Sequence, residues 1–109
     1  MTRLEALLRR SADQRRRHAI AAARRATERL SDVGVEVRVI GSLAAGGFKA
    51  HSDVDLLVVR CPPELRYAIE GLVEDEMGGL PFDVVYLDEV SPPDRTALLE
   101  GARHAAVLP

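Results

Sequence analysis

The sequence is poor in cysteine and in aromatic residues: its 109 residues include one Cys, no Trp, two Phe and two Tyr. A single cysteine, Cys61, excludes an internal disulfide and a cysteine-based metal site, and it is typical of the reducing cytoplasm. So few aromatic rings argue against a surface that binds single-stranded nucleic acid by base stacking. No apolar run approaches the roughly 18 residues that cross a membrane, and the N-terminal segment lacks the apolar stretch of a signal peptide. We therefore expect a single cytoplasmic domain over residues 1–109, with no membrane contact.

Charges of opposite sign are separated along the chain. Residues 1–29 contain nine Arg and three acidic residues, a net charge of +6, whereas residues 30–109 contain six basic and fourteen acidic residues, a net charge of −8; together these give −2. A basic segment of this kind is a solvated helix face, a nucleic-acid arm or a helix that docks on an acidic partner. Direct nucleic-acid binding is the least expected of the three.

The pattern of apolar residues predicts a helix first and then strands alternating with helices. Residues 1–31 form the basic N-terminal segment, and positions 2–31 within it favour one long helix because they are rich in Ala, Arg and Leu and lack Gly and Pro. Its apolar stripe is mostly Ala and buries little area, so we expect the helix to lean on the sheet or on a second chain. The further expected elements are strands over 35–40, 53–59 and 82–87, a short helix or turn after residue 43, and helices over 62–78 and 93–106. This order predicts a small α/β (α+β) domain with a mixed sheet flanked by helices.

Three aspartates fall on the polar faces of two of these strands. Alternation places Asp53 and Asp55 on one side of the second strand and Asp83 on the polar side of the third. If the strands are neighbours, the three carboxylates converge and raise one another's pKa. Divalent cations relieve such repulsion, and Mg²⁺ prefers oxygen ligands together with water and substrate phosphates. The pattern therefore predicts a metal site.

A phosphate-binding turn is predicted just before these aspartates. Gly41 and Ser42 stand where the first strand ends and a helix begins, a place where backbone N–H groups and a hydroxyl bind phosphate oxygens. A phosphate cradle beside metal-binding carboxylates is typical of nucleotide chemistry.

These residues resemble the signature of the nucleotidyltransferase superfamily related to DNA polymerase beta. Ile40-Gly41-Ser42 is followed after ten residues by Asp53-Val54-Asp55-Leu56, and Asp83 matches the separate third carboxylate. The stretch 41–59 is especially similar to the minimal nucleotidyltransferases, small proteins often paired with a HEPN-domain protein in toxin–antitoxin modules. The likeness covers the predicted catalytic core, residues 35–88, and the segment 91–109 matches only as a C-terminal helix.

The resemblance implies roles for individual residues. Asp53, Asp55 and Asp83 would be catalytic and would hold two Mg²⁺ ions, while Gly41 and Ser42 would bind the phosphates of ATP, with Lys49 as a further nucleotide contact. One position departs from the family, because members often carry an Arg where this chain has Ala45. Lys49, Arg38 or an arginine of a partner would then supply the missing positive charge.

The same resemblance implies a protein adenylyltransferase that moves AMP from ATP to a hydroxyl group. The expected acceptor is a tyrosine or another hydroxyl of a HEPN-domain partner in a hetero-oligomer, which the chain silences as an antitoxin. One alternative is a catalytically weak antitoxin that neutralises its partner by occlusion, which the missing Arg favours. A second alternative is a transferase for a small molecule such as an aminoglycoside, although the chain lacks a second domain to bind one.

Overall fold

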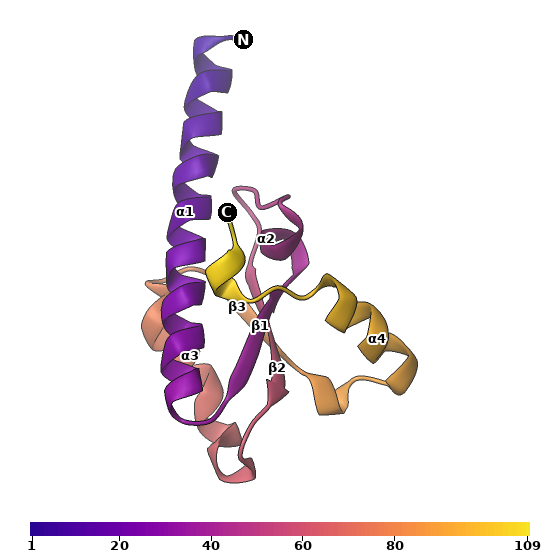
Figure 1. Cartoon of the computed structure of the whole chain (residues 1–109). Coiled ribbons are helices and arrows are strands. Elements are labelled where there is room, and N and C mark those ends of the chain that lie inside the picture. Colours follow the sequence, from indigo (N-terminus) through magenta and orange to yellow (C-terminus); the bar gives the residue numbers. More distant parts are fainter.

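The first element is a long helix that runs beyond the rest of the molecule at its N-terminus. The computed structural model describes all residues, 1–109, and helix α1 spans Arg3–Asp32 (Figure 1). Thr2 starts it, because its hydroxyl accepts a hydrogen bond from the Glu5 backbone N–H. Gly34, with φ +86°, then turns the chain into the first strand. None of the helices is long and apolar enough to span a membrane.

The three predicted strands form one mixed sheet. Strands β1 (Glu36–Ile40) and β2 (Val54–Arg60) are antiparallel, whereas β2 and β3 (Phe82–Tyr86) are parallel, so the strand order is β1-β2-β3. The segment between β2 and β3 begins as a 3₁₀-helix over Pro63–Ala68 and continues as helix α3, Ile69–Met77. This arrangement confirms the predicted mixed α+β architecture.

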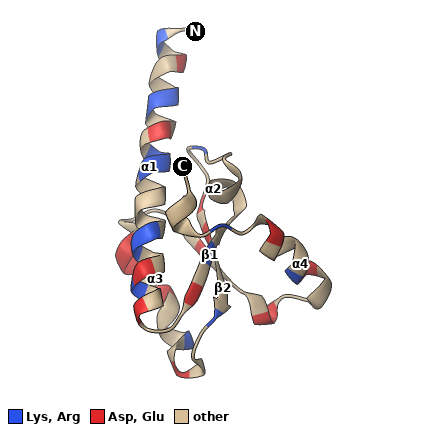
Figure 2. Cartoon of the chain, viewed as in Figure 1, with Lys and Arg blue, Asp and Glu red and all other residues tan.

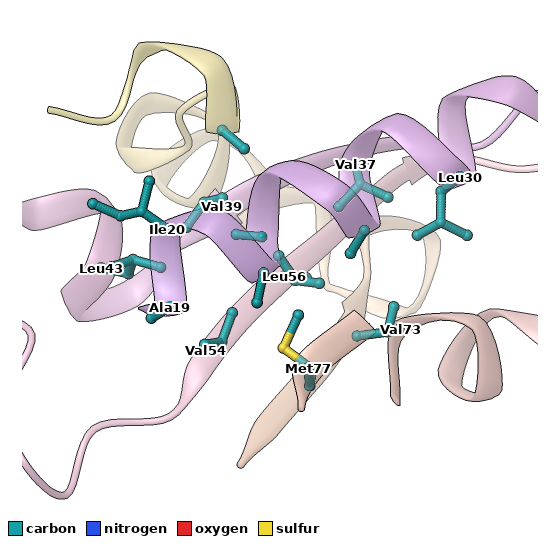
Figure 3. Packing of buried hydrophobic residues seen from close by; sticks show 14 of the residues in the cluster. Ala19, Ile20, Leu30, Val37, Val39, Leu43, Val54, Leu56, Val73 and Met77 are labelled. Atoms are coloured by element: carbon teal, nitrogen blue, oxygen red, sulfur yellow. The ribbon is translucent and has the colours of Figure 1, made fainter. Parts of the chain in front are cut away.

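Helices α1 and α3 cover one face of the sheet. The alanines of the second half of α1 are buried there against alternate residues of the strands, so the helix leans on its own sheet over this half. Small side chains let the helix approach the strands closely. Figure 3 shows this cluster, with Leu30 of α1 near Val37 at one end and Ala19 near Val54 at the other.

Ion pairs join the basic α1 to the acidic α3. Arg29 lies 3.2 Å from Asp75, and Arg25 lies 3.4 Å from Glu76. Part of the opposite charge seen along the sequence is therefore matched within the molecule, at the end of α1 that packs on the body (Figure 2).

The C-terminal segment differs from the predicted helix over 93–106, which is wrong in its second half. Helix α4 spans Pro92–Gly101, and the chain then runs extended before a last 3₁₀ turn over Ala105–Val107. The backbone of Arg103 exchanges two hydrogen bonds with Val39 at the outer edge of β1. Ala105 and Leu108 are buried beside α1. Strand pairing and core burial stabilise this path more than another turn of helix would.

Candidate functional site

The end of β1 has a backbone conformation that favours glycine and brings it against an aspartate. Gly41 begins the short helix α2 (Gly41–Ala45) with φ +70°. A Cβ at this position would overlap the carboxylate of Asp55, which lies opposite Ile40 in the β1–β2 pairing. A glycine is therefore needed here both for the left-handed conformation and for the close approach of Asp55.

The sheet register brings the three predicted aspartates together. Asp55 is directly opposite Asp83 in the parallel pairing of β2 and β3, and Asp53 lies two residues before Asp55. Val54 and Leu56 alternate with them and point into the core under α1, so Asp55 projects from the other face. On that face α4 has its main contact with α2, and Leu57, two residues further along β2, is fully buried, so the exposed part is the end of the face that carries the aspartates. The register thus places Asp55 beside Asp83 as predicted, with Asp53 near enough for its charge to act on Asp55, while their role as a metal site stays a prediction.

The electrostatics of this cluster favour a bound cation. Burial raises the pKa of the half-buried Asp55 carboxyl, and the negative charges of Asp53 and Asp83 raise it further. Asp53 and Asp83 are themselves exposed to solvent. A divalent cation placed among the three would remove the repulsion that disfavours the ionised form of Asp55.

The donor atoms of the three aspartates suit a metal ion, although their side chains do not form a preformed chelating site. No group of three or more His, Cys, Asp or Glu side chains is drawn together closely enough to chelate an ion alone. The donors are all carboxylate oxygens, the ligands that Mg²⁺ prefers, and Mg²⁺ usually completes its shell with water and substrate phosphates. Asp53 and Asp83 are exposed to solvent, so the aspartates occupy an open part of the surface. Such a face leaves room for a phosphate group to supply the remaining ligands.

Helix α2 and the loop after it border the aspartates. No side chain caps the N-terminus of α2, and the hydroxyl of half-buried Ser42 makes no hydrogen bond within the chain. Lys49 is exposed on the loop, where the hydroxyl of Ser52 accepts a hydrogen bond from its backbone N–H. Ala45 is exposed at the end of α2. The residues predicted to bind phosphate thus lie on the segment joining β1 to β2, while their roles stay predictions.

One of the positive charges suggested as a replacement for the family arginine is engaged elsewhere. Arg38 stands within β1, and its guanidinium lies 2.9 Å from the Glu36 carboxylate and donates to the Val37 carbonyl. Lys49 makes no ion pair, so it is the better candidate of the two.

Sequence reasoning missed a contact that holds the loop before Asp53. Arg15 of α1 donates to the Ser52 carbonyl at 3.3 Å, and its guanidinium lies 5.8 Å from the centre of the Phe48 ring. In the sequence Arg15 only interrupts the apolar stripe of the helix, and a charged residue within such a stripe was the one available signal. Arg15 and the buried Phe48 tie the two ends of the loop to α1.

Comparisons with known proteins agree with this geometry. The family model described as "Nucleotidyltransferase domain" matches residues 20–103. A solved structure provisionally described as a minimal nucleotidyltransferase is similar to this chain, with 28% sequence identity and a TM-score of 0.51. The match covers 85% of this chain and 91% of that one. No curated protein matches the chain significantly.

Proposed function

Since this chain belongs to the nucleotidyltransferase domain family, we propose that it transfers AMP from ATP to a hydroxyl group with the help of Mg²⁺. The observation that carries the proposal is that Asp53, Asp55 and Asp83 lie near one another at the end of the sheet where β2 and β3 begin, with Gly41 in close contact with Asp55. Oxygen ligands beside a glycine turn match the needs of a metal-bound triphosphate.

Each residue of the site has a distinct task in this proposal. Asp53 and Asp55 would hold Mg²⁺, two ions in all, and Asp83 would either hold the second ion or accept the proton of the attacking hydroxyl. When bound, the metal lowers the pKa of the acceptor hydroxyl and neutralises phosphate charge. Gly41 allows the backbone to approach the β- and γ-phosphates, and the free Ser42 hydroxyl donates to them. Together these contacts orient the triphosphate so that pyrophosphate leaves in line as the acceptor oxygen attacks the α-phosphorus.

The acceptor in this proposal is a tyrosine or another hydroxyl on a HEPN-domain protein, and its modification makes the chain an antitoxin. Support comes from the similarity to a minimal nucleotidyltransferase. The open face around the aspartates also leaves the site accessible to an acceptor on a large molecule.

A second candidate function is an antitoxin that only binds its partner and transfers no AMP. The observation that favours it is Ala45, which provides no positive charge where family members often carry Arg. Retention of all three aspartates, including the partly buried Asp55, favours the catalytic function over it.

Co-expression with the product of the neighbouring gene, which we expect to be a helical HEPN-domain protein, tests the proposal. We expect a stable complex in which the intact mass of the partner rises by one or more AMP units, and we expect Asp53→Asn to abolish the increase. A tight complex with an unmodified partner would support the binding-only function. AMP transfer to a small molecule by a chain that ignores the partner would refute the antitoxin role.

A further inference from the structure

The N-terminal turns of α1 extend beyond the body of the protein and expose leucines. Residues 3–10, here called the overhang, have nothing packed against them (Figure 1). Leu4 is 64% exposed and Leu8 is 61% exposed, and the neighbouring Leu7 is also exposed. A soluble helix does not need three large apolar residues in water, so this face is suited to contact another molecule.

The exposed leucines continue the face of α1 that packs on the sheet. Steps of three or four residues lead from Leu4 and Leu8 to Ala19 and Ala26, so all four lie on one stripe of the helix. Ala19 and Ala26 are fully buried where α1 packs on the body, whereas Leu4 and Leu8 are exposed. The N-terminal turns of α1 extend past the end of the sheet (Figure 1). The stripe is therefore buried where α1 packs on the sheet and exposed where α1 extends beyond it.

The charges beside the leucines specify the partner. Arg3, Arg9 and Arg10 make no ion pair, unlike Arg25 and Arg29 further along the helix. Arg3 and Arg10 border the leucines on one side, and Glu5 and Arg9 lie on the other, which gives residues 3–10 a net charge of +2. Figure 2 shows blue turns alternating with red ones along this part of α1. A second copy of α1 would add a further net charge of +2 and further unpaired arginines beside Arg3 and Arg10. A helix with acidic borders would pair with them.

We propose that the overhang docks an amphipathic helix of the acceptor protein, one whose apolar stripe is bordered by Asp and Glu. This inference rests on the proposed function, and it adds the surface and the chemistry by which the acceptor is held. Helix-on-helix packing of such stripes is a common recognition mode, in which leucines supply the contact and charges select the partner.

The position of the overhang explains why an acceptor docked there would be useful. Arg15 lies seven residues after Leu8, about 10 Å along the helix, and it contacts Ser52, the residue before Asp53. A helix is about 10–12 Å wide with its side chains. A partner on the overhang is therefore held at the end of the molecule that carries the aspartates.

A binding experiment with defined peptides tests the proposal. The probes are a synthetic amphipathic helix with a leucine stripe and Glu borders, and a twin with Lys in place of Glu, each titrated by fluorescence anisotropy. We expect the Glu peptide to bind the wild type, and Leu8→Ser to weaken binding at least about tenfold, the factor that removal of a buried leucine produces. The Lys twin should bind at least about tenfold more weakly than the Glu peptide.

Leu99→Ser is the matched control, because Leu99 is 45% exposed on α4, away from the overhang. Equal weakening by both variants, or no binding of the Glu peptide, would overturn the proposal. A Leu8-dependent dimer in sedimentation velocity would assign the overhang to a second copy, and Leu8-dependent binding to anionic vesicles without peptide binding would assign it to lipid. Calorimetry with Mg²⁺-ATP on the same variants tests the docking proposal separately from the proposed nucleotide chemistry. Leu8→Ser should weaken peptide binding and leave nucleotide binding unchanged.

Discussion

Asp55 combines three features of a residue kept for binding rather than for stability. It is half-buried, it faces Asp83 across the strand pairing, and it lies against Gly41. Burial and two neighbouring negative charges raise the pKa of its carboxyl above the ordinary 3.8. Because the folded state holds the proton more tightly than the unfolded state, the ionised form destabilises the fold.

Asp55→Asn should therefore raise the free energy of unfolding at pH 7 when no divalent cation is present. The penalty in the wild type is fully present above the raised pKa of the folded state and absent below 3.8, where Asp55 is protonated in both states. The difference between variant and wild type should accordingly shrink as the pH falls towards 3.8. Thermal melts across this range measure it, with Asp13→Asn, an exposed carboxylate in no ion pair, as the control. A variant less stable than wild type at pH 7 would contradict the account.

Gly41 and Gly46 form a matched pair of glycines at the two ends of α2. Both have positive φ, +70° and +91°, but a Cβ on Gly41 would overlap Asp55 whereas nothing lies within 4 Å of one on Gly46. Gly46→Ala should lose about 1–2 kcal/mol for the left-handed conformation, and each kcal/mol lowers Tm by roughly 4–8 °C. Gly41→Ala should lower Tm further and also weaken binding of Mg²⁺-ATP. Equal effects of the two changes would show that Asp55 does not depend on Gly41.

Among the elements, α2 carries Ala45 at the position where the resemblance to minimal nucleotidyltransferases implies an arginine. Ala45 is exposed at the end of α2 and provides no positive charge. Ala45→Arg should tighten the binding of a non-hydrolysable ATP analogue about tenfold or more, since a well-formed hydrogen bond to a charged group contributes roughly 1.5–3 kcal/mol. Titration calorimetry measures the change, with Ala45→Gln as the uncharged control. Unchanged affinity in the Arg variant would mean that position 45 does not face the phosphates.

Elements whose pattern is local were predictable from sequence. Alternation in β2 predicted that Asp53 and Asp55 share a face, and the apolar positions of β3 predicted which way Asp83 points. The path after Gly101 was not predictable in this way, because Ala-rich residues favour helix locally. The Arg103–Val39 pairing that overrides this preference joins positions far apart in the chain. Contacts of this kind depend on tertiary packing, which local helix propensity does not describe.

At the scale of the whole molecule, α1 has two halves with different environments. Its second half packs on the sheet, one of the two contacts expected from the sequence, and pairs with α3. Its first half extends past the body with unpaired arginines and exposed leucines. Arg15 stands between the halves and contacts the loop before Asp53. The helix thus supports the fold at one end and reaches past the aspartates at the other.

The central claim is that the three aspartates hold the metal of a bound nucleotide. Titration calorimetry of ATP, with and without Mg²⁺, into wild type, Asp53→Asn and Asp55→Asn tests it most directly. Wild type should bind ATP only with Mg²⁺, and each variant should weaken this binding by at least about 100-fold, the loss of a few kcal/mol of metal-mediated contact, while both variants still fold. Undiminished Mg²⁺-dependent binding in both variants, or binding by wild type that ignores Mg²⁺, would contradict it.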